Sequence, residues 1–357
     1  MNTILIAATE ESSGKTAIAL ALATLAIDRG HSVGYMKPKG TRLQTNTGKT
    51  LDTDPMLARE VLDIDAEMGD LEPVVYSPTF IEGAIRRRDD PAEIHGAVVE
   101  SFERLAEGRD TMVIEGGDRL ATGGIVDLTD PDVAELLDAR VVLVVDYEGP
   151  GDVDGVLGDV ELIGDRLGGV VFNRVPDAVR DTLEGDVVPF LERRGVPVLG
   201  VVPRTPDLAG VTVGDLADEL GAELLTDAAT DGVVERFLVG AMGADEALKS
   251  FRRAKDAAVV TGGDRPEIHT AALEAPGVTC LVLTGGFRPP PAVLGKAEDR
   301  GVPVLLVGSE TLPTVERLEG IVRGGRTRDR RTVERMSELL YEHATVDDLL
   351  GEPVDGA

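Results

Sequence analysis

The segment Ala8–Thr16 reads ATEESSGKT and contains the residue types that bind the phosphates of a nucleotide. It follows a strand-like apolar run, Thr3–Ala8, and precedes a helical pattern, Lys15–Arg29. In a phosphate-binding loop (P-loop) the backbone N–H groups and a helix N-terminus surround the phosphates, a lysine bridges the β and γ groups, and a hydroxyl holds Mg²⁺. The segment therefore predicts binding of ATP with Mg²⁺, with Lys15 and Thr16 in the last two roles.

One position departs from the usual loop pattern, because Ala8 stands where a glycine is expected. The alternative interpretation is a degenerate loop that has lost its ligand. We favour a binding loop because the Gly14–Thr16 core and its strand–helix context are intact. A second Gly-Lys-Thr run at residues 48–50 has no preceding strand, so we interpret it as a coincidence. The loop residues expected to contact the nucleotide are Thr9, Ser12, Ser13, Gly14, Lys15, Thr16 and Ala17.

Three further charged residues lie where they could join this loop. Lys37 comes just after the second strand pattern, Asp54 opens a helical pattern, and Glu115 closes an apolar strand pattern. A carboxylate at the end of a buried strand beside a P-loop strand is placed to orient Mg²⁺. We therefore predict that Glu115 and Thr16 orient Mg²⁺, with Lys37 in the same crevice and Asp54 as a further acidic candidate. The alternatives are a solvated strand end for Lys37 and a helix cap for Asp54.

The distribution of lysine supports a phosphate site near the N-terminus. Only seven of the 36 basic residues are lysines, and four of the seven lie within the first 50 residues. These four are Lys15, Lys37, Lys39 and Lys49. A chain that otherwise uses arginine keeps lysine where a compact ammonium is needed, as at a phosphate. Chance clustering is the alternative.

Composition excludes several classes of function. The formal net charge of −29 and the pI near 4.4 give a surface that repels nucleic acids and anionic membranes. The chain has no Trp and lacks the aromatic platforms that single-strand binders use. No apolar run approaches the roughly 20 residues of a membrane span, and we find no signal peptide, so we expect a cytoplasmic protein. Acidity spread along the whole chain suits a very salty cytoplasm, although an ordinary acidic protein is the alternative.

Apolar strands alternate with helical patterns through residues 1–205, which predicts an α/β fold with a parallel sheet and helices on both faces. A segment rich in Pro and Gly, Arg204–Gly210, ends this region, and a smaller α/β alternation follows it. We expect domains at 1–207 and 211–345 and a tail at 346–357. The expected strands of the first domain are Thr3–Ala8, Ser32–Met36, Thr111–Glu115, Arg140–Val145, Gly169–Asn173 and Val198–Val202. The expected helices include Pro91–Glu107 and Asp177–Arg194 in the first domain and Val213–Leu225 and Asp329–Tyr341 in the second.

The motifs of the first domain occur in a familiar order. The series ATEESSGKT, YMKP, TDPMLA, VVYSPTF, VIEGG and FNRV resembles the dethiobiotin synthetase type of P-loop protein over residues 1–205. The resemblance implies that Asp54 and Glu115 complete the metal site. It also implies that the catalytic lysines are Lys15, which contacts the phosphates, and Lys37, which stabilises the transferring phosphoryl group or a carboxylate substrate. Asn173 with Arg174 is implied to contact the adenine. Related synthetases pair across the nucleotide crevice, so a homodimer is implied as well.

The rest of the chain resembles a DRTGG-type domain, through the runs VERFLVGAMGADEALKSF, AAVVTGGDR, LVLTGG and GVPVLLVGSETLPTVERL. The order of the two domains resembles the N-terminal region of long phosphotransacetylases. We expect the acyltransferase domain that follows there to be absent here. The literal DRTGG string is replaced by Thr261–Arg265. Glycines at this strand end and at Thr284–Gly286 fit an anion site or tight turns equally well.

Other chemistries have weaker support. Cys280 lies inside a strand pattern and is interpreted as a buried apolar residue and not as a nucleophile. The four histidines are scattered and suggest no zinc site. Partition-type ATPases carry an extra lysine where this chain has Glu10.

Two functional hypotheses are favoured. The first is a nucleotide-sensing regulatory protein that acts on a partner enzyme of acetate or acyl-CoA metabolism, with a small carboxylate or acyl compound as a further effector. The second is an ATP-dependent ligase that phosphorylates a carboxylate or carbamate. Dethiobiotin synthesis itself is disfavoured because the glycine-rich stretch after Glu115 reads Gly116–Arg119, GGDR, which alters the substrate pocket. A structural scaffold ranks last because it leaves the lysine clustering unexplained.

Overall fold

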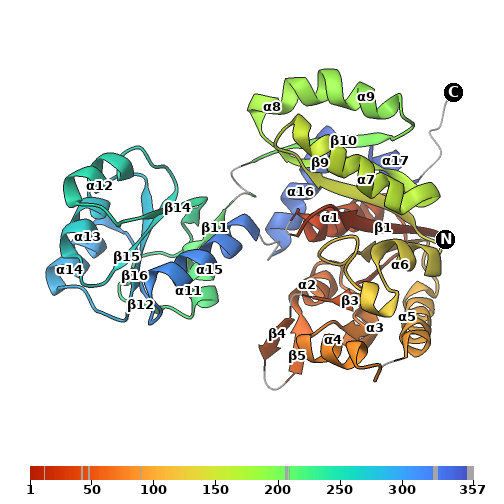
Figure 1. The fold of residues 1–357 in the computed structure, drawn as a ribbon, viewed down its shortest axis with the longest axis horizontal. Helices are drawn as coiled ribbons and strands as arrows, with labels where there is room; N and C mark the ends of the chain where they lie inside the picture. Colours follow the sequence, from red (N-terminus) through yellow and green to blue (C-terminus); the bar gives the residue numbers. More distant parts are fainter. Residues whose placement is uncertain are drawn as a thin grey trace. The chain divides into compact units, whose positions relative to one another are not determined.

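The computed structural model describes residues 1–11, 13–41, 43–46, 49–88, 90–205, 208, 210–324 and 329–351. The chain forms two compact units, each visible in Figure 1. Unit 1 comprises residues 1–205 and 327–357, and unit 2 comprises residues 206–326. Within the described residues, no helix combines the length and apolar character that crossing a bilayer requires.

Unit 1 is built on a parallel sheet of six strands, with β1 in its interior. In sheet order the strands are β10 (Val198–Pro203), β9 (Leu167–Val175), β8 (Arg140–Asp146), β1 (Asn2–Ala8), β7 (Thr111–Glu115) and β2 (Val33–Met36). The interior strands are near-continuous apolar runs because helices cover both faces of the sheet. The predicted α/β fold with a parallel sheet and helices on both faces is therefore confirmed.

The helices of unit 1 include two that come from the end of the chain. They are α1 (Lys15–Asp28), α2 (Thr53–Val61), α3 (Met68–Leu71), α4 (Pro78–Ile85), α5 (Pro91–Ala106), α6 (Asp130–Leu136), α7 (Val153–Ile163), α8 (Asp177–Thr182), α9 (Val188–Glu192), α16 (Arg330–His343) and α17 (Val346–Leu350). Ten of the fourteen residues of helix α1 are Ala, Leu or Ile. It has no polar face because it packs between the β1–β7 side of the sheet and α16.

Short strands extend unit 1 beside the main sheet. Strand β3 (Lys39–Gly40) pairs with β6 (Val74–Val75), and β4 (Leu43–Asn46) pairs with β5 (Lys49–Asp52). Neither pair was expected from the sequence. Strands β3, β4 and β5 carry the chain from the end of β2 to the start of α2, and therefore position Lys39 and Asp52.

The return of the chain to unit 1 differs from the expected domain division. The sequence pattern placed the helix near residues 329–341 in the second domain, whereas α16 packs along α1 and contributes Val333 to the core of unit 1. Beyond it, the Thr345 amide donates to Leu199 O at 2.8 Å. The Arg140 guanidinium donates to the carbonyls of Asp348 and Leu349, both at 2.6 Å. An amphipathic pattern indicates that a helix packs on an apolar core, but it does not indicate whether that core belongs to unit 1 or to unit 2.

Unit 2 is a smaller α/β unit with a five-stranded sheet. In sheet order its strands are β12 (Glu223–Leu224), β17 (Val304–Leu306), β16 (Val278–Thr284), β15 (Ala257–Gly262) and β14 (Arg236–Val239). All neighbours are parallel except β12 with β17. Strands β11 (Val211–Thr212) and β13 (Val233–Val234) form a separate pair. The helices are α11 (Val213–Leu220), α12 (Ala244–Phe251), α13 (Pro266–Leu273), α14 (Pro291–Arg300) and α15 (Thr311–Gly324).

Two expected helices differ in the structure: one ends early and one is interrupted. The pattern over residues 213–225 stops at Leu220, because Gly221 adopts a left-handed conformation with φ of 60° and a strand follows. The pattern over residues 177–194 contains a π-helical turn between α8 and α9.

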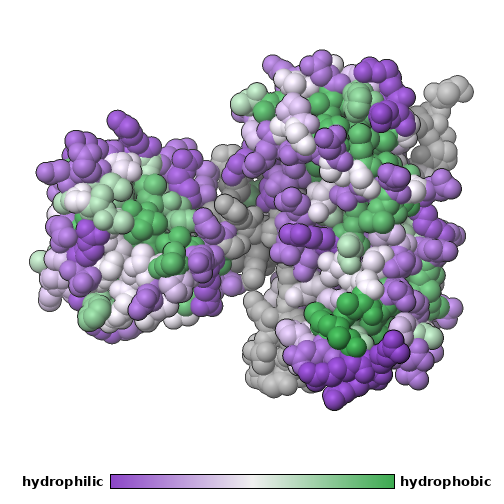
Figure 2. All heavy atoms as spheres, viewed as in Figure 1, coloured by the Kyte–Doolittle hydropathy of each residue, from purple (hydrophilic) through white to green (hydrophobic). Residues whose placement is uncertain are grey.

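On the faces seen in Figure 2, hydrophilic residues surround smaller apolar patches, consistent with a strongly acidic composition.

Candidate functional site

The predicted phosphate-binding loop joins β1 to α1. Gly14 caps the helix with φ of 90°, a left-handed conformation that glycine adopts readily. The Asn173 side-chain amide donates to Ser13 O at 2.8 Å, and a Cβ atom on Gly14 would lie 2.4 Å from that same nitrogen. Ala8 remains within the regular pairing of β1 with β8 and has no positive φ. The loop therefore requires glycine at position 14 and not at position 8.

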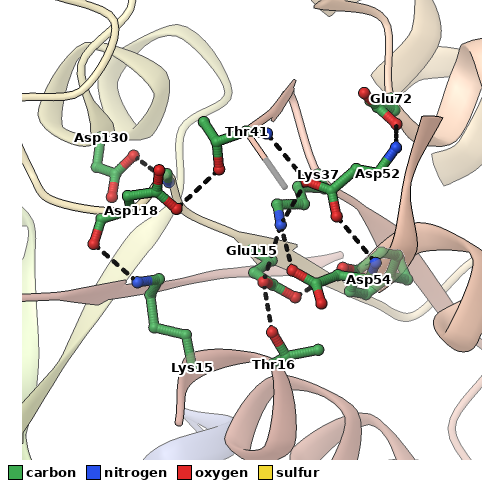
Figure 3. A network of polar contacts seen from close by, with 12 residues as sticks. Lys15, Thr16, Lys37, Thr41, Asp52, Asp54, Glu72, Glu115, Asp118 and Asp130 are labelled. Atoms are coloured by element: carbon green, nitrogen blue, oxygen red, sulfur yellow. Dashed lines mark hydrogen bonds and ion pairs between the residues drawn. The ribbon is translucent and has the colours of Figure 1, made fainter. Parts of the chain in front are cut away.

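Thr16 and Glu115 meet at the start of α1 (Figure 3). The Thr16 hydroxyl donates to Glu115 Oε1 at 2.8 Å, and the Tyr35 hydroxyl donates to Glu115 Oε2 at 2.7 Å. The parallel register of β1 and β7, which pairs Ile6 with Glu115, brings this carboxylate to the loop. Burial raises the pKa of Glu115 to about 6, although the Lys37 ammonium favours its ionised form.

Lys37 lies among three buried carboxylates (Figure 3). Its ammonium contacts Asp54, lies 3.0 Å from Asp52 and lies 3.4 Å from Glu115. Burial disfavours the charged amine, but Glu115, Asp54 and Asp52 together raise the pKa of Lys37 above its ordinary value. A permanently charged lysine at this point can bind an anion and is unsuited to acting as a base.

Asp52 was missed by the sequence analysis. Its Oδ1 accepts the Asp54 amide at 2.9 Å and so caps α2, while its Oδ2 accepts the Thr41 amide at 2.9 Å. The signal that would have identified it is its place directly before a helix, where Asp is a preferred cap. Asp54, for which a capping role was the alternative, instead contacts Lys37.

Lys15 extends towards the segment that follows Glu115. Its ammonium donates to Asp118 O at 3.0 Å, and Asp118 Oδ1 accepts the Thr41 hydroxyl at 2.8 Å. Neither Thr41 nor Asp118 was among the predicted site residues. Asp118 belongs to the altered stretch after Glu115, and its carboxylate reaches Thr41, which directly follows β3.

The oxygen donors of this cluster fit a hard cation. Thr16, Asp54 and Glu115 supply one hydroxyl and two carboxylates around Lys37. Within the described residues, no set of three His, Cys, Asp or Glu side chains is arranged to hold a metal ion unaided. Mg²⁺ commonly takes only one or two protein carboxylates and completes its shell with phosphate oxygens and water. The donor set therefore suits Mg²⁺ accompanied by a phosphate ligand.

The remaining predicted residues are spread around the loop. Asn173 is 1% exposed and holds the loop through Ser13, while Arg174 adopts φ of 54° and pairs with Asp146. Ala17 is buried in the first turn of α1, and Thr9 donates its amide to Val144 O. Ser12 lies outside the described residues, as does the side chain of Lys49.

The glycine-rich strand ends of unit 2 form turns. The Gly263 amide donates to Thr284 O, the Gly285 amide to Ser309 O and the Gly286 amide to Val307 O. These three amides are therefore already engaged within unit 2, which favours tight turns over an anion site at these positions. Cys280 is fully buried in β16, and burial raises the pKa of its thiol to about 12. Such a thiol is unsuited to nucleophilic attack.

The parallel sheet and the loop between β1 and α1 define a P-loop α/β protein. A family model described as an AAA domain matches residues 2–212, and a model described as a DRTGG domain matches residues 215–321. The chain belongs to this AAA-domain family, which is dethiobiotin synthetase-like, and carries a DRTGG domain after it. The expected resemblance is thus confirmed for both domains. Residues 330–350, which form α16 and α17, lie outside both matches.

Curated relatives extend the comparison. A phosphate acetyltransferase of Pseudomonas putida is 26% identical over 96% of this chain and 50% of its own length. One from Synechocystis is 22% identical over 89% of this chain and 47% of its own length. A cobyric acid synthase of Halorhodospira halophila is 29% identical over 58% of this chain and 47% of its own length. The chain thus spans about half the length of these relatives.

Solved structures give weaker likenesses. The cell division protein MinD of Aquifex aeolicus aligns with a TM-score of 0.37 and 18% identity, over 58% of this chain and 84% of its own. The CBS and DRTGG domains of the Clostridium perfringens pyrophosphatase regulatory region, solved with diadenosine tetraphosphate, align with a TM-score of 0.28 and 16% identity. That match covers 41% of this chain and 70% of the other.

Proposed function

We propose that the chain binds ATP with Mg²⁺ at the loop between β1 and α1 and acts as a nucleotide-sensing regulatory protein of acetate or acyl-CoA metabolism. The observation that carries the binding proposal is the 2.8 Å hydrogen bond from Thr16 to Glu115, with Lys15 and Lys37 on either side of it. A hydroxyl at the helix start and a carboxylate behind it are the groups that hold and orient Mg²⁺ on a nucleotide.

The regulatory role is supported by how the relatives cover the chain. Phosphate acetyltransferases match both units over 89–96% of its length, whereas the synthase match covers 58%. A chain that shares both units with an acyl-transferring enzyme is most simply assigned to the control of that chemistry. We further propose a cytoplasmic homodimer that contacts a partner enzyme of this metabolism.

A ligase remains the second candidate because of one observation. Lys37 is 2% exposed and is held among Asp52, Asp54 and Glu115, although burying a charged cluster of this kind is costly. A sensor needs affinity alone and could lose this lysine. A ligase would use it to stabilise charge on a transferring phosphoryl group or to hold a carboxylate substrate.

Calorimetry with ATP and Mg²⁺ at molar salt, for the wild type and for Lys15→Ala, tests the proposal. We expect saturable binding by the wild type and its loss in Lys15→Ala. Hydrolysis assays with and without candidate carboxylates then separate the two candidates. No turnover supports the sensor, whereas turnover that Lys37→Ala removes makes the ligase the working model. If the wild type does not bind ATP, the loop has lost its ligand and the proposal is wrong.

A further inference from the structure

Lys39 and Asp130 form a buried ion pair that the proposed function does not use directly. Lys39 is 1% exposed and Asp130 is 0% exposed. The Lys39 ammonium donates to Asp130 Oδ1 at 2.7 Å and to Leu128 O at 2.8 Å. Burying two charges is costly unless their geometry is good and further hydrogen bonds are satisfied. A pair kept under such conditions calls for a role beyond stability.

The ion pair supports the backbone segment Glu115–Asp118. Asp130 Oδ1 also accepts the Gly117 amide at 2.8 Å, so one carboxylate oxygen joins Lys39 to this segment. A Cβ atom on Gly116 would lie 2.3 Å from Asp130 Oδ2, and one on Gly117 would lie 2.7 Å from Lys39 Cε. The two glycines therefore lie directly against the ion pair and leave no room for a side chain.

The supported segment ends at the phosphate-binding loop. The next residue, Asp118, accepts the Lys15 ammonium through its carbonyl and the Thr41 hydroxyl through its side chain. At the other end of the segment, Glu115 accepts the Thr16 hydroxyl. Both ends of the segment Glu115–Asp118 are thus in contact with the first residues of α1, and the ion pair holds its middle.

We propose that Lys39 and Asp130 are positioning residues for the nucleotide site. The ion pair between the two residues fixes Glu115–Asp118 against Lys15 and Thr16. This inference rests on the ATP and Mg²⁺ binding proposed above. The pair also accounts for the retention of Lys39 in a chain that prefers arginine. A compact ammonium fits between a carbonyl and a carboxylate, whereas a guanidinium is larger and planar.

The test measures ATP affinity by calorimetry, with and without Mg²⁺, for Lys39→Met, Asp130→Ala and the milder Asp130→Asn. We expect the Mg²⁺-dependent affinity to fall by about 10- to 100-fold in the first two, as is typical when groups that orient metal ligands are removed. Asp130→Asn retains an acceptor for the Gly117 amide and should lose less. Lys296→Met, which removes a partly exposed ion pair with Glu274, is the matched control and should bind normally.

Amide hydrogen exchange at Gly117 gives a readout that does not depend on the nucleotide. Exchange should accelerate in Asp130→Ala and stay slow in Lys296→Met. Folded variants with wild-type affinity would overturn the inference, as would an equal loss of affinity with and without Mg²⁺. If Lys39→Met does not fold, Asp130→Asn decides the outcome by the same criteria. If the wild type does not bind ATP, the proposed function is wrong. In that case, unchanged exchange at Gly117 in Asp130→Ala would also refute the proposal that Asp130 holds Glu115–Asp118 in place.

Discussion

The Asn173 side-chain amide donates a 2.8 Å hydrogen bond to the carbonyl oxygen of Ser13, so the end of β9 holds the phosphate-binding loop. The family resemblance implied a different role, contact with the adenine. The donor side of the amide thus serves the loop. Asn173 Oδ1 is buried and has no hydrogen-bond partner among the described residues, and contact of this side chain with the adenine stays a prediction.

The first prediction follows from this bond. Asn173→Ala leaves the Ser13 carbonyl unsatisfied, at a cost of about 1–3 kcal/mol. We expect affinity for ATP and for GTP to fall together, by about tenfold for each 1.4 kcal/mol expressed in binding. Calorimetry with both nucleotides measures the two losses. A variant that loses ATP affinity alone would show that Asn173 recognises the base and does not shape the loop.

The second prediction concerns Glu115. In Glu115→Gln the side chain keeps its size and its contact with Thr16, but it loses the negative charge that orients Mg²⁺. We expect the Mg²⁺-dependent part of ATP affinity to fall by about 10- to 100-fold. Titration of Mg²⁺ into the ATP complex measures the change. Tyr35→Phe is the matched variant, because it removes the other hydrogen bond to Glu115 without changing charge, and it should lose less. Equal losses in the two variants would contradict the prediction.

The third prediction concerns pH and Glu72. Burial raises the pKa of Glu72 to about 7, with Asp52 adding to the rise, although the Asp52 amide that Glu72 accepts opposes it. Because the folded-state pKa lies above the ordinary value of 4.5, the protonated carboxyl favours folding. This stabilisation is fully present below pH 4.5 and is lost as the pH rises through about 7.

Glu72→Gln cannot titrate and should lack this loss. Between about pH 4 and about pH 8, the free energy of unfolding of the variant should rise relative to the wild type by about 1–3 kcal/mol. Urea denaturation at several pH values measures the difference between the two proteins. A difference that stays constant across this range would show that the carboxyl titrates alike in the folded and unfolded chains.

Much of unit 1 was predictable because its strands are apolar runs and its loop has fixed spacing. Helix α5, for example, begins at Pro91 as expected, with Asp90 as its cap. The carboxylates Asp54 and Glu115 were expected near Lys37, and they lie in contact with it. Residue type and position at a strand or helix end were sufficient for these.

What the sequence did not indicate depends on tertiary contacts. Asp118 acts through its backbone carbonyl, which no residue type or spacing marks. The place of Asp52 before a helix indicates a cap, but not its contact with Lys37. The Lys39–Asp130 pair joins positions 91 residues apart. The short strand β14 at residues 236–239 has a weak pattern of its own and forms because β15 offers it an edge.

The fourth prediction concerns the single cysteine. Cys280 is fully buried in β16 and its thiol pKa is raised to about 12, so it should not react with a thiol reagent in the folded protein. Labelling should follow the unfolding transition when denaturant is added. Mass spectrometry of the product at each denaturant concentration measures the fraction modified. Rapid labelling of the native chain would contradict the burial and reopen a nucleophilic role.

The fifth prediction tests whether the end of the chain is part of the P-loop unit. Leu340 is fully buried in α16, whereas its neighbour Tyr341 is 71% exposed. Leu340→Ala should lower the free energy of unfolding by about 2–5 kcal/mol, because it leaves a cavity in the helix that packs on α1. Tyr341→Ala should stay within about 0.5 kcal/mol of the wild type.

Amide hydrogen exchange then locates the loss within the molecule. If α16 belongs to unit 1, Leu340→Ala should accelerate exchange in α1 and β1 and leave β15 and β16 unchanged. Because α1 begins at Lys15 and Thr16, the same variant should also weaken ATP binding, and Tyr341→Ala should not. Faster exchange confined to residues 257–284 would instead assign this helix to unit 2 and contradict the division of the chain described above.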